Sequence, residues 1–228
     1  MQANTSYICK YSKSPTPSQT IMITKITFIR HGEVHNPNKI YYGRFPRFRL
    51  SDTGRKQAAM TADYLRGECI TAVYSSPMLR ARQTAKAVTA VHPHPLHISQ
   101  LLNEAYTPYD GQSQQTLDAK NWDVYTGTPA TYEQPIDITN RIARFIKRTR
   151  KRHEGQHIVA VTHADPFAFA VLWASNSPPS ITGRKQLTKV GLADDFPGHA
   201  AAVTLTFNGK CERPTSFTYF NPEALEVA

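Results

Sequence analysis

A short alternating run followed at once by the sequence RHGE constrains this chain more than any other feature. In residues 23–29 (ITKITFI), Ile26 and Phe28 alternate with threonine, with the two-residue period of a strand that has one buried face. Arg30 and His31 come directly after this run. Because open α/β sheets bind ligands at the carboxyl ends of their strands, we expect these two side chains at the mouth of a site.

The residue types in this motif suit phosphoryl chemistry. Arginine offers a planar fork of donors that matches a phosphate group, and a neutral imidazole is a competent nucleophile. The glycine at position 32 lets the backbone turn sharply and lets a ligand approach closely. The motif therefore predicts an anion site, and other strand ends should supply further residues for it.

Length, cysteine content and hydropathy narrow the class of protein. With 228 residues the chain is long enough for one α/β domain, and no apolar run approaches the length of a membrane span. The three cysteines, Cys9, Cys69 and Cys211, are widely spaced and odd in number. This pattern disfavours a disulfide framework or a structural zinc site. We therefore expect a cytoplasmic protein that does not associate with membranes.

The formal net charge of +10 would attract anions, either a nucleic acid or a phosphorylated small molecule. Much of this charge lies in residues 141–152, on a predicted amphipathic helix with Ile138, Ile142 and Phe145 on its opposite face. No zinc-finger, homeodomain or RNA-recognition signature accompanies the basic run. We interpret it as a solvated surface and expect no specific nucleic-acid partner.

Strands and helices alternate along the chain from residue 23 onward. Strands are predicted at 23–29, 70–74, 96–98, 157–162, 200–207 and 214–219, and helices at 51–66, 78–91, 135–152 and 166–174. Residues 103–133 lack a strong period and should form loops with one short helix. This order predicts an α/β fold, a three-layer α/β/α sandwich whose central sheet is mainly parallel with an antiparallel edge.

Composition separates a short extension from one domain. Residues 1–21 are rich in Gln, Asn, Ser, Thr and Pro and lack the apolar stretch of a secretory signal, so we interpret them as a flexible extension. Met22 directly precedes the first strand and is a candidate start. Residues 22–228 then form a single domain. Within it, residues 175–198 are rich in Ser, Pro, Gly and Asp and predict a mobile flap.

Three further segments place chemistry-bearing residues at strand ends or in a loop. The sequence SSPMLRARQTA takes a strand into a helix whose first turn carries Arg80, and the free amides of a helix start attract anions. The sequence VTHAD repeats the strand-to-helix pattern with His163. The sequence LLNEAYTPYDG is a loop that would hold the carboxyl group of Glu104.

In this order, the segments resemble the histidine phosphatase superfamily, the group that includes the cofactor-dependent phosphoglycerate mutases. The matching stretches are RHGE at 30–33, YGR at 42–44, LSxxGxxQA at 50–58, SSPxxRAxQTA at 75–85, NEA at 103–105 and TH at 162–163. They span roughly residues 23–170. The tripeptide RHG alone would be a weak signal, whereas the ordered set is highly specific.

The resemblance implies a phosphoglycerate mutase-like fold and phosphoryl transfer in two steps. His31 would attack phosphorus and become a phosphohistidine, while Glu104 would protonate the leaving oxygen and then activate water. Arg30, Arg80 and His163 would bind the phosphoryl oxygens, and neither a metal nor another cofactor would be needed. Further substrate contacts are expected from Gly32, Asn36, Tyr42, Gly43, Arg44 and Ala164.

Two of these positions depart from the family pattern. Asn36 lies five residues after the nucleophilic histidine, where many members have six. Ala164 stands where glycine is common, although an alanine amide still donates a hydrogen bond. Glu33 and Asp110 are alternatives to Glu104 as the catalytic acid.

The resemblance implies a phosphomonoester hydrolase of small phosphorylated molecules. Mutases of the family carry a long insertion between the acid-bearing loop and the second histidine, and here that segment is short. A phosphoglycerate mutase-type phosphotransferase is one alternative. A non-catalytic phospho-ligand binding protein is another alternative, and the complete set of site residues argues against it.

A basic rim around the site favours a substrate with more than one anionic group. The residues predicted to form this rim are Arg44, Arg47, Arg49, Arg184 and Lys185. The sequence leaves a homodimer open.

Overall fold

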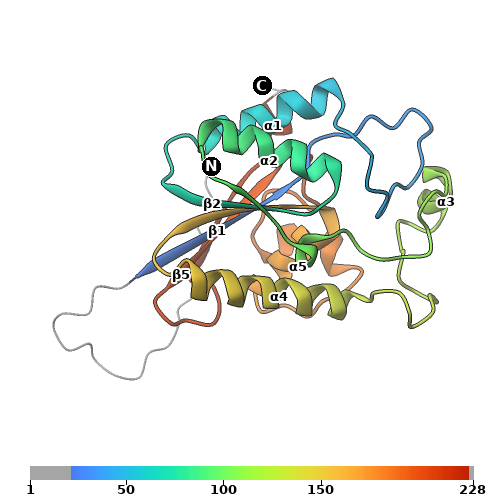
Figure 1. The fold of residues 1–228 in the computed structure, drawn as a ribbon. Coiled ribbons are helices and arrows are strands. Elements are labelled where there is room, and N and C mark those ends of the chain that lie inside the picture. The colour runs from blue at the N-terminus through green and yellow to red at the C-terminus, as the bar shows by residue number, and fades with distance from the viewer. Residues whose placement is uncertain (1–21, 226–228) are drawn as a thin grey trace.

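The computed structural model describes residues 22–225, so the extension predicted for residues 1–21 lies outside the described residues. Within this range six strands form one mixed sheet, in the order β3-β2-β4-β1-β5-β6. The strands are β1 (Ile23–Arg30), β2 (Ile70–Ser75), β3 (Leu96–Ile98), β4 (His157–Thr162), β5 (Ala202–Asn208) and β6 (Ser216–Phe220). The α-helices are α1 (Asp52–Tyr64), α2 (Leu79–Val91), α3 (Gln114–Ala119), α4 (Pro135–Arg152) and α5 (Ala164–Ala174) (Figure 1).

Strand β1 lies inside the sheet and joins its parallel and antiparallel parts. It pairs in parallel with β4, with Arg30 opposite Thr162, and antiparallel with β5. Strands β2 and β3 continue the parallel part, and β6 forms an antiparallel edge on β5. The mainly parallel sheet with an antiparallel edge is therefore confirmed. Because β1, β4 and β2 are parallel neighbours, their carboxyl ends meet at one edge of the sheet.

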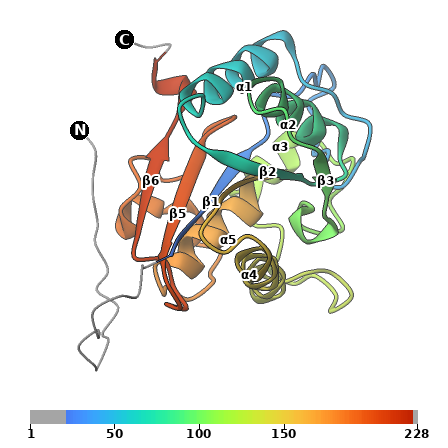
Figure 2. The same ribbon diagram turned by 60° about the vertical axis from the view of Figure 1, so that its left-hand side comes forward.

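Two apolar cores hold helices against the two faces of the sheet. Helices α1 and α2 pack on one face, over a core that includes Ile29, Val73 and Val161. Helices α4 and α5 pack on the other face, over a core that includes Phe28 and Phe169 (Figure 2). Neighbouring β1 residues thus enter opposite cores, as the alternation of a strand requires. The predicted three-layer sandwich is confirmed.

Helix α4 has the predicted amphipathic character. Its apolar face is buried at Ile138, Ile142, Phe145 and Ile146. Its basic face is exposed at Arg144, Lys147, Arg148, Lys151 and Arg152, in agreement with a solvated surface. Arg141 is an exception, because it is buried and donates from Nε to Glu133 at 2.8 Å. One residue of the predicted basic run, Arg141, therefore lies in the protein interior and not on the exposed basic face.

Two segments near the site differ in detail from the sequence predictions. Helix α5 begins at Ala164, two residues earlier than predicted, because an acidic residue and a proline both suit a first helical turn. Residues 175–198 contain two 3₁₀ helices, η2 (Gly183–Lys185) and η3 (Leu187–Val190), in which Arg184 and Leu187 are buried. The mobility of this segment stays a prediction.

No helix in the described part of the chain is long and apolar enough to cross a membrane.

Candidate active site

His31 lies just beyond β1 and is almost fully buried. Its main-chain amide donates to Thr162 of β4 at 3.0 Å, which fixes the residue at the shared edge of the two strands. Its Nδ1 lies 2.8 Å from the Gly32 carbonyl oxygen, and Arg80 Nε lies 3.2 Å from its Nε2. Since a carbonyl only accepts and a guanidinium only donates, the ring carries its proton on Nδ1 and keeps a lone pair on Nε2. In this form Nε2 can act as a nucleophile.

The surroundings of His31 keep its ring neutral. Burial, followed by the positive charges of Arg80 and Arg30, holds the pKa of His31 well below its usual value. Burial and the charge of Arg80 hold the pKa of His163 low in the same way. Both rings are therefore uncharged at neutral pH, and the positive charge in this part of the molecule resides on the arginines.

Gly32 allows the motif to approach the start of α1 very closely. A Cβ atom at Gly32 would lie only 2.3 Å from the carbonyl oxygen of Gly54, so a side chain at this position would displace backbone. The Gly32 amide donates to Thr84 of α2 at 3.1 Å. Glu33 accepts a hydrogen bond from Ser51, the N-cap of α1, and is absent from the described residues that line the cavity.

Arg80 in the first turn of α2 connects the histidine to the loop around Tyr42. Its side chain is fully buried, and its guanidinium donates to the carbonyl oxygens of Gly43 and Phe45. The guanidinium carbon also lies 4.7 Å from the centre of the Tyr42 ring. The neighbouring Arg82 is exposed, so the helix directs only one of its two first-turn arginines to the site.

His163 and Arg30 complete the cluster around His31. His163 is the N-cap of α5, and its ring centre lies 5.2 Å from that of His31. Its Nε2 lies 2.8 Å from Ser76 Oγ. Arg30 donates from Nη1 to the Pro197 carbonyl oxygen at 2.7 Å. Two buried nitrogens, Arg30 Nε and His163 Nδ1, have no hydrogen-bond partner within residues 22–225. Orphaned polar atoms beside the neutral His31 ring indicate a place for a polar ligand.

Glu104 lies in the loop after the 3₁₀ helix Gln100–Leu102 and lines the same cavity. Its Oε1 accepts from the Ala105 amide at 2.9 Å, and its main-chain carbonyl accepts from Arg44 Nε at 2.9 Å. Burial, together with the negative charge of Asp165, raises the pKa of Glu104 to about 7. A carboxyl group with this pKa can hold a proton and release it near neutral pH, as general acid–base catalysis requires.

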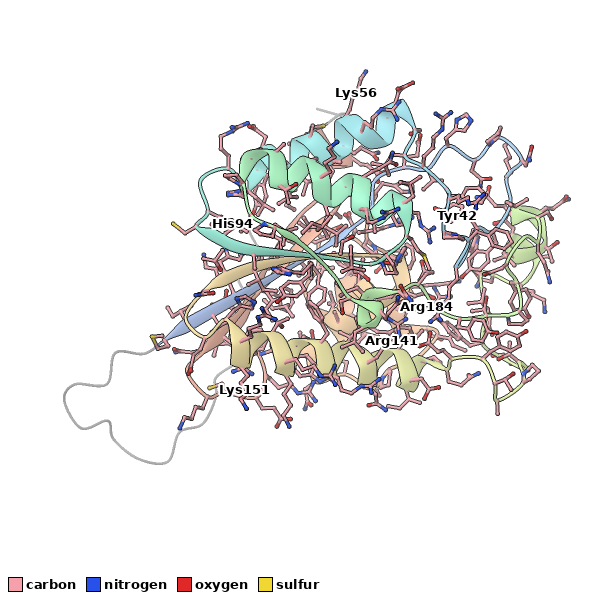
Figure 3. The ribbon with its side chains drawn as sticks, in the orientation of Figure 1. Tyr42, Lys56, His94, Arg141, Lys151 and Arg184 are labelled. Atoms are coloured by element: carbon pink, nitrogen blue, oxygen red, sulfur yellow. The ribbon has the colours of Figure 1, made fainter. Side chains whose placement is uncertain are left out.

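The cavity has a volume of about 540 Å³ and brings most of the predicted residues together. Six of them line it, namely Arg30, His31, Tyr42, Gly43, Glu104 and Ala164. Arg80, His163 and Gly32 adjoin His31 directly. Tyr42 and Arg184 lie toward the same end of the molecule, whereas His94 lies toward the opposite end (Figure 3). Within residues 22–225, no group of three or more His, Cys, Asp or Glu residues is placed to hold a metal ion.

Asn36 and Arg44 are not among the residues that line this cavity in the described chain. Both side-chain polar atoms of Asn36 bond to the main chain of Ile40. The Arg44 guanidinium donates to Glu133 at 2.9 Å. Contacts of either residue with a substrate stay predictions, and the structure shows only their structural bonds.

Asp110 supports the loop that carries Tyr42. Its Oδ2 accepts from the Arg44 amide at 3.0 Å, and a Cβ atom at Gly43 would overlap its Oδ1 at 1.7 Å. Gly43 also has a φ of +30°, which favours glycine. Asp110 does not line the cavity, and neither does Glu33, so among the three candidate acids only Glu104 does.

Only part of the predicted basic rim lines the cavity. Arg47 and Arg49 are exposed, and only Arg184 and Lys185 of the five rim residues line the cavity. Arg184 is buried and donates from Nη1 to Asp165 at 2.7 Å, so its charge is already balanced. Carboxylates distant in sequence pair with Arg44 and Arg184, so two of the five predicted rim charges are balanced, and the positively charged rim stays a prediction.

Several cavity residues were missed by sequence reasoning. His199 lies with its Nε2 3.1 Å from Arg30 Nη2 and its Nδ1 2.9 Å from Glu223 Oε1. Burial and the charge of Arg30 lower the pKa of His199, so the neutral ring accepts from Arg30 and donates to Glu223. Trp122 packs on the core and also lines the cavity. Neither residue belongs to a motif or a periodic segment, so no local signal identified it.

Comparison with known sequences shows the family to which this chain belongs. Residues 26–193 match the model of the histidine phosphatase superfamily (branch 1). An uncharacterised protein of Mycobacterium tuberculosis is 36% identical over 150 residues, covering 63% of this chain and 74% of that protein. Phosphoserine phosphatase 1 of Hydrogenobacter thermophilus is 27% identical over 158 residues, covering 63% of this chain and 72% of that protein.

A solved structure has the same fold. Phosphoserine phosphatase from Entamoeba histolytica, in complex with 3-phosphoglyceric acid, superposes with a TM-score of 0.69 at 22% identity. The match covers 87% of this chain and 98% of the other. The predicted phosphoglycerate mutase-like fold is confirmed. On the matched residues and this fold, the chain belongs to the histidine phosphatase superfamily (branch 1).

Proposed function

We propose that this protein is a phosphomonoester hydrolase that acts through a phosphohistidine on His31, with Glu104 as general acid and base. The observation that carries the proposal is the state of His31, a neutral ring with its proton on Nδ1 and its Nε2 lone pair directed at Arg80. A buried cation beside this lone pair would hold a phosphoryl oxygen next to the attacking atom. Relatives that are named phosphatases support a hydrolytic reaction.

In the first step, Nε2 of His31 forms a bond to phosphorus while the bond from phosphorus to the leaving oxygen breaks. Glu104 gives its proton to that oxygen and becomes a carboxylate. In the second step, this carboxylate takes a proton from water, the water oxygen attacks phosphorus, and the P–N bond breaks to free His31 and phosphate. A pKa of about 7 supports both roles, because each form of Glu104 is accessible near neutral pH.

Three groups would stabilise the charge on the phosphoryl oxygens. Arg80 contacts the His31 ring, Arg30 precedes His31 in sequence and lines the same cavity, and the rings of His163 and His31 meet edge to face. The orphaned nitrogens Arg30 Nε and His163 Nδ1 would gain partners from a bound phosphoryl group. In the proposed reaction these contacts stabilise the phosphoryl charge, so the reaction needs no metal ion.

Phosphate release from p-nitrophenyl phosphate in the presence of EDTA tests the proposal. The wild-type protein should release phosphate, and His31→Ala should reduce kcat by about 10³-fold or more. His35→Ala is a matched control, because His35 is an exposed histidine close in sequence. Acid-labile phosphate on the wild-type protein, absent from His31→Ala, should identify the intermediate.

The outcomes separate the proposed reaction from its alternatives. Equal activity of His31→Ala and His35→Ala would contradict the phosphohistidine. No phosphate release, combined with transfer between the hydroxyls of 3-phosphoglycerate, would favour a mutase-type phosphotransferase. Tight binding of phosphomonoesters without either reaction would favour a binding protein.

A further inference from the structure

Part of the cavity lies beyond the phosphoryl-binding residues and is built from apolar side chains. Ile40, Tyr41, Trp122 and Val124 line it, and we call these four residues the apolar wall. The Tyr41 and Trp122 rings meet edge to face, with their centres 6.3 Å apart and their planes at 66°. Val124 is buried, and both rings pack on the main core. This wall offers flat apolar surface to whatever is attached to the phosphoryl group.

The backbone of the apolar wall is strained and firmly held. Asn121 and Trp122 have φ values of +49° and +54°, a left-handed conformation that is costly for two successive residues other than glycine. The Trp122 indole donates to Asp118 at 2.7 Å and its amide to Leu117 at 2.7 Å. Such strain persists only where several contacts impose it, and it concentrates at ligand sites.

Residues of the segment 175–198 clamp this turn from the other side. Arg184 donates to the Trp122 carbonyl oxygen, and Lys185 donates to the Asn121 carbonyl oxygen. Trp122 is therefore held by side chains from two separate segments of the chain. These hydrogen bonds fix the position of the Trp122 ring in the cavity.

The cations beside the apolar wall already have partners: Lys185 donates to Asn121, and Arg184 is paired with a carboxylate. Arg184 and Asp165 form a buried ion pair, and Tyr125 donates to the same carboxylate. To bind Arg184, a second anion on a substrate would have to displace Asp165, and it would also face the negative charge that Glu104 acquires in the reaction. Breaking a buried ion pair is strongly unfavourable. This end of the cavity therefore disfavours an anionic group.

We propose that the apolar wall is the subsite for the leaving group and that it takes an uncharged, flat, apolar group, as in an aryl monoester of phosphoric acid. The inference rests on the proposed function and adds the class of substrate to it. The ring of the substrate lies against Trp122, while its phosphoryl group lies between Arg30, Arg80 and His31. A leaving group that bears a carboxylate or a second phosphate is disfavoured, because it competes with Asp165 for Arg184 and with Asn121 for Lys185.

The test compares kcat/KM for three substrates. Phenyl phosphate and 4-carboxyphenyl phosphate share a ring and differ by one negative charge, and acetyl phosphate has no ring. The wild-type protein should prefer phenyl phosphate over its carboxylated form by about ten-fold or more. Trp122→Ala should lower kcat/KM for phenyl phosphate by about ten-fold more than that for acetyl phosphate, because only the former loses ring contact. Trp122→Phe should retain most of the activity on phenyl phosphate.

Two results would overturn the subsite while leaving the hydrolase intact. One is a wild-type protein that hydrolyses the carboxylated ester as well as or better than phenyl phosphate. The other is an equal loss on phenyl phosphate and acetyl phosphate in both Trp122 variants, which would assign Trp122 to the fold or to the phosphoryl end. If Trp122→Ala does not fold, the wild-type ratio and Trp122→Phe decide the question. Hydrolysis of none of the three substrates by the wild-type protein would contradict the proposed function itself.

Discussion

Two buried arginines beside the cavity, Arg80 and Arg184, differ in what balances their charge. Arg184 is bound to the carboxylate of Asp165 at 2.7 Å. Arg80 is bound to two main-chain carbonyl oxygens and to His31, and within residues 22–225 no carboxylate lies within ion-pair distance of it. The first arrangement is a closed ion pair, and the second is a buried positive charge that lacks a counter-charge.

The difference shows how one residue type serves two purposes in one cavity. A buried charge without a partner is unfavourable in isolation, and it attracts an anion strongly once one enters. A paired buried charge holds segments together and has little attraction left for a ligand. In a sequence the two arginines look alike, and only the position of an acidic partner distinguishes them.

Of the two arginines, Arg80 should have the larger effect on activity when it is replaced. Arg80→Lys should lower kcat/KM by about 10²–10³-fold, because a lysine cannot reproduce the geometry of the guanidinium around a phosphoryl group. Steady-state kinetics on p-nitrophenyl phosphate provides the measurement. Arg82→Lys, on the exposed side of the same helical turn, is the control and should behave like the wild type. Similar activities for both variants would remove Arg80 from the site.

Breaking the Arg184 pair should instead affect stability. Asp165→Leu leaves Arg184 buried without its partner and should reduce the free energy of unfolding by about 3–5 kcal/mol. Urea denaturation measures this change. The double variant Asp165→Leu with Arg184→Met removes both charges and should recover most of the loss. If the single and double variants are equally unstable, the ion pair is not the reason for the instability.

The pH dependence of activity should reflect Glu104. Its folded-state pKa of about 7 lies above the usual value, so the proton that the first step needs is present below pH 7 and lost above it. We expect kcat/KM to fall as pH rises through 7. Asp165→Asn should move this fall to lower pH, because the charge of Asp165 helps to raise the pKa of Glu104. A shift to higher pH in this variant would contradict the assignment.

The same pKa also predicts the sign of a stability change. A carboxyl group whose pKa is raised by folding binds its proton more tightly in the folded state. The resulting contribution to stability is complete below the unfolded pKa and is lost as pH rises to about 7. Glu104→Gln should abolish this part of the pH dependence of unfolding, as measured by denaturation at several pH values.

The smallest effect is expected at His199, which acts on Arg30. His199→Ala should lower kcat/KM by about ten-fold, because the guanidinium of Arg30 loses an acceptor that orients it. His199→Gln keeps an acceptor oxygen and should restore part of the activity. A variant series in which Ala and Gln are equally defective would indicate a role in packing, not in orienting Arg30.

Sequence reasoning was most successful where a residue and its neighbours in sequence determine the structure. The boundaries of β3, β4 and α4 agree with prediction because apolar periodicity and turn residues define them locally. His31 and Arg80 were found because each follows a strand in a recognisable motif. For Arg44, Glu133 lies far along the chain and decides its contacts, so the side chain could not be assigned from its own segment.

The same limitation applies to the rest of the cavity. Trp122 comes from a segment without periodicity, and its position depends on Arg184 and Lys185, which follow some sixty residues later. His199 becomes relevant only because β5 returns beside β1 and places it next to Arg30. Such contacts depend on the assembled fold, so neither composition nor local pattern carries a signal for them.

The division between the sheet and its connecting segments has an evolutionary consequence. His31 and Arg30 stand at the end of a core strand, whereas Trp122 and Arg184 belong to connections that contribute no strand to the sheet. In the proposed reaction, substitutions in those connections would change which alcohol is released without moving His31. A scaffold arranged in this way can diversify its substrates while the chemical step is inherited unchanged.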